Sequence, residues 1–131
     1  MTDKAAYWLE LAEYDLETAR AMLDTGRYLY VGFMCHQVIE KALKGLYVQV
    51  TGETPPYVHD LRLIARRANV YDEMPEHLKD VVDMLIPMNI QSRYPTDWEE
   101  VRRGLNKDRC LRILQDTGEL HTWIKERLLS E

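Results

Sequence analysis

The sequence has few of the residues that interrupt regular structure or cross-link a small fold. It holds six glycines, five prolines and two cysteines among 131 residues. So little glycine and proline excludes a low-complexity or disordered chain. The two cysteines, Cys35 and Cys110, are too few for a disulfide framework and form no CxxC metal motif. We interpret both as small buried apolar residues in a reducing compartment.

Long apolar runs and an excess of positive charge are also missing. No apolar stretch approaches the roughly 20 residues that a membrane span needs. Acidic residues recur from Asp3 onward, which does not fit a signal peptide. We therefore expect a cytoplasmic protein that does not associate with membranes. The net charge of −5 disfavours a protein that coats nucleic acid by general electrostatics, although a local basic site remains compatible with it.

Hydrophobic periodicity predicts an all-α fold. Steps of four and three separate the apolar residues of the first predicted helix, which are Ala5, Leu9, Ala12, Leu16, Ala19 and Leu23. A second helix, predicted over 27–51, is apolar on almost every face and is therefore expected to be central. Further helices are predicted over 60–68, 75–87 and 106–129, with a loop over 91–104 that contains one helical turn near 98–101. We predict a single domain over residues 1–131, an up-and-down antiparallel bundle of four to five helices.

Polar residues on the second helix are the first candidates for a site. Residues four apart lie one above the other on a helix, so the segment HQVIEKALK places five polar side chains together: His36, Gln37, Glu40, Lys41 and Lys44. One interpretation is an exposed face with helix-supporting Glu–Lys pairs. The other is a binding surface bordered by neighbouring helices, which the apolar surroundings favour.

Two loop segments supply the other candidates. His59 and Asp60 follow two prolines and precede a predicted helix, where Asp60 suits a helix cap and His59 either orients the loop or joins the polar residues of the second helix. Arg93 and Tyr94 lie in a loop before Pro95. A guanidinium beside an aromatic ring suits phosphate and base recognition, and it also suits ordinary loop packing.

Several familiar constellations are absent. There is no glycine-rich phosphate loop, no dinucleotide fingerprint and no pair of Glu-x-x-His segments. The four histidines lack zinc-ligand spacing. We therefore expect neither a metal nor a cofactor, and no residue can be named as catalytic from the pattern alone.

Taken in order, these segments resemble the HEPN domain family, small helical prokaryotic domains often found beside minimal nucleotidyltransferases. The resemblance covers nearly the whole chain. It rests on Ala12, Asp15, Leu16 and Ala19, on Phe33 and the HQxxEKxLK segment, on Pro56 and His59-Asp60-Leu61, and on Arg93-Tyr94-Pro95. It implies a helix bundle that forms a homodimer and binds nucleotide or RNA. It also implies a nucleotidyltransferase as partner in a toxin–antitoxin-like module.

Many members of that family are metal-independent ribonucleases with an Arg followed by a His four to six residues later. None of the four histidines here has such an arginine before it. Our leading hypothesis is therefore a domain that binds nucleotide or RNA phosphate without the usual cleavage motif. In it, Lys41 and Lys44 supply charge, Arg93 grips a phosphate, Tyr94 stacks a base, and His36 and His59 donate hydrogen bonds.

Two alternatives remain open at this point. One is an endoribonuclease toxin with an unconventional site shared across a dimer interface, in which His36 or His59 is the general base and Arg93 stabilises the phosphate. The other is a purely structural interaction module, whose polar residues form an internal ion-pair network between Glu40 and either Lys44 or Arg93.

Overall fold

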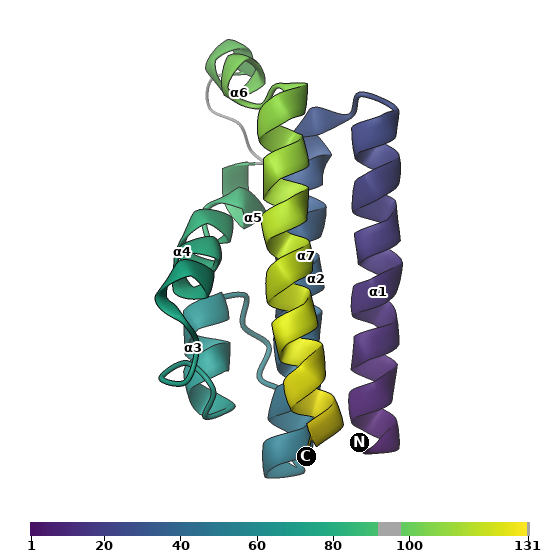
Figure 1. Ribbon diagram of the computed structural model, residues 1–131, viewed down its shortest axis with the longest axis vertical. Coiled ribbons are helices and arrows are strands. Elements are labelled where there is room, and N and C mark those ends of the chain that lie inside the picture. The colour runs from purple at the N-terminus through teal and green to yellow at the C-terminus, as the bar shows by residue number, and fades with distance from the viewer. Residues whose placement is uncertain (92–97, 131) are drawn as a thin grey trace.

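The computed structural model describes residues 1–91 and 98–130, and its long helices lie side by side in a bundle (Figure 1). The long helices are α1 (Asp3–Asp24), α2 (Tyr28–Thr51), α4 (Glu76–Leu85) and α7 (Lys107–Ser130). Each runs opposite to the one before it, so α2 and α7 point the same way and form the central pair. The predicted all-α, up-and-down bundle is confirmed.

Capping side chains and glycines define the ends of the helices. Thr2 caps α1, because its hydroxyl accepts a hydrogen bond of 3.1 Å from the backbone N–H of Ala5. Asp60 caps the short helix α3 (Leu61–Arg67) in the same manner. Gly26 and Gly52 follow α1 and α2 with φ values of 76° and 71°, a left-handed conformation that favours glycine.

Helix α2 is the centre of the core, as its apolar composition predicts. Its fully buried apolar side chains pack between α1, α7 and α3; they are Val31, Cys35, Val38, Ile39, Ala42, Leu43 and Leu46. The alanines of the α1 seam are fully buried as well. Small residues at this seam let α1 approach α2 closely, most of all near Gly45. The core therefore immobilises α2 and every polar side chain that it carries.

The segment around Pro87 and the segment after residue 97 contain more helix than expected. Helix α4 stops at Leu85, as the proline predicts, and a single turn, α5 (Met88–Gln91), follows at once. Helix α6 (Trp98–Gly104) is longer than the one turn predicted near 98–101. Within α6 the Arg102 guanidinium pairs with the Glu99 carboxylate one turn earlier, which supports the added helix.

Both cysteines are buried and unpaired, which confirms their interpretation as apolar core residues. No helix within the described residues is both long and apolar enough to cross a membrane.

Candidate functional site

Glu40 lies at the centre of a buried polar cluster on α2. Only 4% of the residue is exposed, because α1, α3 and the loop before α3 surround this part of the helix. One carboxylate oxygen, Oε2, accepts a hydrogen bond of 3.0 Å from Lys44 Nζ, one helical turn further on. Lys44 is 7% exposed. The two charges therefore neutralise each other inside the protein rather than in water.

The second oxygen of Glu40 binds His59, which comes from the loop before α3. His59 Nδ1 lies 2.9 Å from Glu40 Oε1. A carboxylate accepts and does not donate, so Nδ1 carries the proton of this hydrogen bond. The neutral ring then has its lone pair on Nε2, for which no described residue supplies a hydrogen bond. Because the side chain is 56% exposed, a buried carboxylate here holds and orients a solvent-facing imidazole.

His36 fixes the backbone of the same loop. It is fully buried, and its Nε2–H donates to the backbone carbonyl of His59 over 3.2 Å. Its Nδ1 lies 3.8 Å from Glu40 Oε1, which is too far for a hydrogen bond. Since no part of His36 reaches solvent, it positions the loop and does not itself offer a ligand-binding atom at the surface.

The loop reaches this position because of the residues on either side of His59. Asp60 Oδ1 accepts hydrogen bonds from the backbone N–H groups of Arg62 and Leu63, at 3.1 and 3.3 Å, and so fixes the start of α3. Pro55 is buried, which ties down the other end of the loop. Tyr57 is 97% exposed, two residues before His59. The loop thus presents an aromatic ring and an imidazole to solvent together.

The remaining polar residues of α2 separate into two environments. Lys41 turns toward α1, where its Nζ lies 2.6 Å from Asp15 Oδ2. Gln37 is half-buried. The Lys44 ammonium lies 5.9 Å from the centre of the Trp8 ring. The five polar residues therefore do not share one open face, because Glu40 and Lys44 are enclosed while Lys41 bridges two helices.

Two members of this cluster were not assigned to the site from the sequence. Asp15 is an acidic residue inside the apolar seam of α1, and only 6% of it is exposed. A carboxylate this buried needs a partner, which the Lys41 ammonium supplies. Trp8 lies on the edge of the same seam. An acidic residue in a seam of apolar residues indicates a buried polar contact, since a buried carboxylate requires a cation or hydrogen-bond donors nearby.

Arg93 and Tyr94 lie outside the described residues. Their roles, and the pairing of Glu40 with Arg93, stay predictions. Of the pairs expected in an internal network, the structure shows Glu40 with Lys44.

The arrangement is suited to hydrogen bonding and proton transfer at one exposed nitrogen. A carboxylate that accepts from Nδ1 fixes the tautomer of an imidazole, so Nε2 accepts a proton when the ring is neutral and donates one when it is charged. Within residues 1–91 and 98–130, no three or more His, Cys, Asp or Glu side chains are grouped so that they could hold a metal ion.

Comparison with known proteins places this geometry in a family context. The family model described as HEPN domain matches residues 5–128. The structure is similar to that of TT1696 from Thermus thermophilus, with a TM-score of 0.83 and 24% sequence identity over 95% of this chain and 98% of that one. It is also similar to ST0689, an archaeal HEPN homologue, with a TM-score of 0.75 and 23% identity over 97% and 99% of the two chains. No curated protein matches the sequence.

Proposed function

The chain belongs to the HEPN domain family, and from this membership and the Glu40–His59 geometry we propose that it binds nucleotide or RNA phosphate at His59. One observation supports the proposal most directly. A carboxylate with 4% exposure accepts a hydrogen bond from an imidazole that is 56% exposed. Burying the Glu40 carboxylate costs desolvation free energy. The resulting hydrogen bond orients the His59 ring so that Nε2 is available to a ligand.

In this proposal the charged imidazole donates from Nε2 to a phosphate oxygen, while the buried Glu40 carboxylate accepts from Nδ1 and orients the ring. Tyr57, exposed two residues earlier in the same loop, offers a face on which a base can stack. Lys44 and His36 act through Glu40 and the loop, because Lys44 is almost wholly buried and His36 fully so. Gln37 and Lys41 contribute polar groups from α2, where both are half-buried and Lys41 pairs with Asp15, and Asp60 holds the start of α3. Arg93 and Tyr94, which lie outside the described residues, are proposed as a phosphate clamp and a second stacking ring.

The proposed assembly rests on the resemblance to the family. We propose a homodimer in solution and a nucleotidyltransferase as protein partner in a toxin–antitoxin-like module. Light scattering across a concentration series tests the first, and co-purification with a candidate nucleotidyltransferase tests the second. A monomer at every concentration would overturn the dimer without affecting the binding proposal.

Calorimetric titration with ATP, GTP and a short single-stranded RNA tests the binding proposal. We expect His59→Ala to weaken binding about tenfold or more, because a charge-assisted hydrogen bond contributes about 1.5–3 kcal/mol. His77→Ala is the matched control. His77 is 62% exposed and lies 2.9 Å from the Glu119 carboxylate, but that carboxylate is itself 59% exposed. Equal affinities for all three proteins would overturn the proposal.

A second candidate function is metal-independent RNA cleavage with His59 as the general base. The same hydrogen bond favours it, because Nδ1–H donation to Glu40 leaves Nε2 unprotonated in the neutral ring and able to take a proton from a ribose 2′-hydroxyl. His36 is fully buried and cannot reach a substrate in this conformation. Cleavage of a mixed RNA substrate that His59→Ala abolishes would support this function. No cleavage between about pH 5 and 9, the range in which histidine changes charge, would exclude it.

A further inference from the structure

A cavity of about 230 Å³ opens at the end of the bundle where α1 turns into α2, between residues 26–30 and α6 with the residue that follows it. Aromatic and basic side chains line much of it: Arg27, Tyr28, Tyr30, Trp98 and Arg102. Tyr30 and Trp98 are 47% and 45% exposed. Large aromatic rings left this exposed around a concave surface are a common feature of ligand sites.

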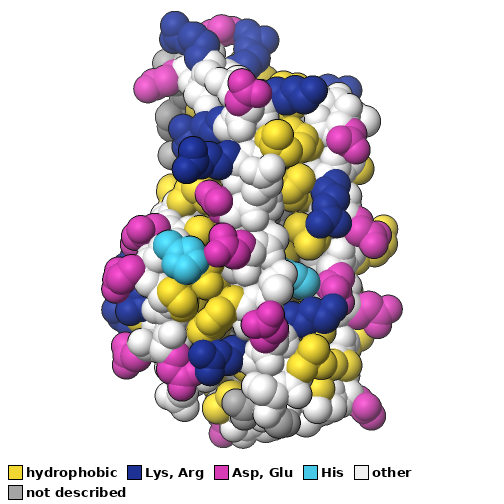
Figure 2. Space-filling view, viewed as in Figure 1, with side chains coloured by type: hydrophobic (Ala, Val, Ile, Leu, Met, Phe, Trp, Pro, Cys, Tyr) yellow, Lys and Arg dark blue, Asp and Glu magenta, His cyan; other side chains and the backbone are white. Residues whose placement is uncertain are grey.

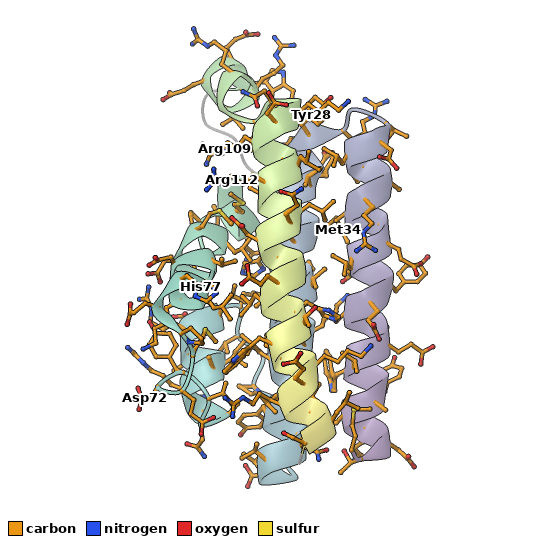
Figure 3. The ribbon with its side chains drawn as sticks, viewed as in Figure 1. Tyr28, Met34, Asp72, His77, Arg109 and Arg112 are labelled. Atoms are coloured by element: carbon orange, nitrogen blue, oxygen red, sulfur yellow. The ribbon has the colours of Figure 1, made fainter. Side chains whose placement is uncertain are left out.

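Positive charge gathers at the same end of the molecule. Five basic and three acidic residues lie between Trp98 and Arg112, a net charge of +2 in a chain whose net charge is −5. Figure 2 shows dark blue side chains crowded over α6 and the start of α7. Figure 3 places Arg109 and Arg112 on one side of the first turns of α7 and Tyr28, at the start of α2, on the other side.

Several of these cations have no acidic partner. Arg102 pairs with Glu99 within α6. In contrast, Arg27, Lys107, Arg109 and Arg112 form no ion pair with any residue that the structure describes. Cations without an acidic partner attract an anion that approaches this end of the bundle. This end of the bundle is therefore electrostatically matched to a polyanion.

We propose that this end is a second binding site, which takes a base stacked on Trp98 while Arg27 and Arg102, the two basic residues that line the cavity, hold its phosphates. Pockets for drug-sized ligands have volumes of about 300–1,000 Å³, so this smaller cavity takes one flat ring system and leaves the rest of the ligand outside. The Arg102 guanidinium lies 5.7 Å from the centre of the Trp98 ring and extends the stacking surface. The ligand class is a nucleoside phosphate, free or as part of single-stranded RNA.

This site is independent of the one at His59. It shares no residue with the Glu40–His59 cluster, and it involves α6, the α1–α2 turn and the start of α7. This second site goes beyond the proposed function and does not depend on it. Substitutions in one site leave the side chains of the other unchanged, so each site can be tested separately.

Fluorescence anisotropy and calorimetry with ATP, GTP and a 5′-phosphorylated single-stranded RNA test the proposal. We expect Trp98→Ala to weaken binding about five- to one-hundredfold, the range measured for loss of base stacking, and Trp98→Phe to restore most of it. Arg27→Glu is expected to weaken binding about tenfold. Arg66→Glu is the control, since Arg66 is exposed on α3 and the same charge is reversed there.

The ligands and variants separate the outcomes. Loss of RNA binding but not of ATP or GTP binding in an Arg109→Glu, Arg112→Glu double variant would identify an RNA strand as the ligand. Unchanged binding of all three ligands in that double variant would confine the ligand to the cavity and identify a free nucleotide. Parent-like affinity in both Trp98→Ala and Arg27→Glu would overturn the proposal, as would no binding of any ligand. Binding that His59→Ala preserves and Trp98→Ala removes would support this site while contradicting the proposed function.

Discussion

Glu40 and His59 are 19 residues apart in the sequence, yet Glu40 Oε1 lies 2.9 Å from His59 Nδ1. The other oxygen of the same carboxylate accepts from Lys44 over 3.0 Å. One buried carboxylate thus joins a helix, a loop and a buried ammonium group. A substitution of Glu40 therefore removes both its hydrogen bond to the exposed imidazole and its ion pair in the core.

Glu40→Gln should therefore destabilise the fold strongly. The substitution removes the negative charge and leaves the Lys44 ammonium, 7% exposed, without a counter-ion. Breaking one side of a buried ion pair costs about 3–5 kcal/mol. The free energy of unfolding from urea titration measures this directly.

A matched control and a rescue variant make this prediction specific. Glu73 pairs with Arg127 over 2.9 Å, but both side chains are at least 40% exposed, so Glu73→Gln should cost less than about 1 kcal/mol. Adding Lys44→Met to Glu40→Gln removes the uncompensated charge and should recover much of the loss. If Glu40→Gln and Glu73→Gln unfold at the same urea concentration, the buried pair does not stabilise the fold.

The sequence predicts the helices and the polar composition of α2 because both are local properties. The seam of α1, the glycines after α1 and α2 and the Asp60 cap all depend on residues within one or two turns. Spacing of four also places His36, Glu40 and Lys44 on neighbouring turns of α2. These three are indeed close in space, and Glu40 pairs with Lys44.

The tertiary contacts of the site could not be predicted in the same way. The spacing of residues along α2 does not predict that the loop before α3 folds back and brings His59 into contact with Glu40. It also does not predict that Lys41 turns toward Asp15 on α1. Which face of a nearly all-apolar helix becomes enclosed depends on how the other helices pack around it. The length of α6 was underestimated because its support, the Glu99–Arg102 pair, lies on a short segment with no buried side chains.

Two helical glycines should respond to alanine in opposite directions. A Cβ at Gly45 would lie 3.1 Å from Trp8 Cβ and 3.3 Å from the backbone oxygen of Ala5, so α1 and α2 would have to separate. Such overpacking costs about 1–3 kcal/mol, which exceeds the gain of about 1 kcal/mol from helix propensity. Gly118 on α7 has no atom within 4 Å of the added Cβ. Gly118→Ala should therefore stabilise by up to about 1 kcal/mol.

Thermal unfolding of the two variants side by side tests this pair of predictions. Each serves as the control for the other, because both changes add one methyl group inside a 24-residue helix. A stabilised Gly45→Ala variant would show that the α1–α2 seam has room that the structure does not indicate.

The two thiols should be unreactive in the folded protein. Burial raises the pKa of Cys35 to about 12 and that of Cys110 to about 11, and only the thiolate is nucleophilic. At pH 8, an aromatic disulfide reagent should label neither thiol until denaturant unfolds the chain, after which both react. Ser130→Cys, an exposed thiol near the end of α7, should react at once. Rapid labelling of the native parent would contradict the enclosed position of both cysteines.

His121 should make the fold less stable at acidic pH. Burial lowers its pKa from 6.5, with Lys125 and Arg20 acting in the same direction and Glu13 opposing them. The folded chain therefore binds a proton less readily than the unfolded chain. Stability is fully present above about pH 6.5, begins to fall as the pH drops below that value, and continues to fall until the pH passes the lowered pKa.

Urea midpoints between pH 5 and 8 measure this effect in the parent and in His121→Leu. Leucine cannot bind a proton, so the variant should lose less stability than the parent over this range. His77→Gln provides the comparison for a histidine that is exposed and should follow the parent. If the parent and His121→Leu lose stability in parallel, the acid sensitivity comes from other groups, and the buried imidazole between α1 and α7 is protonated in the fold without penalty.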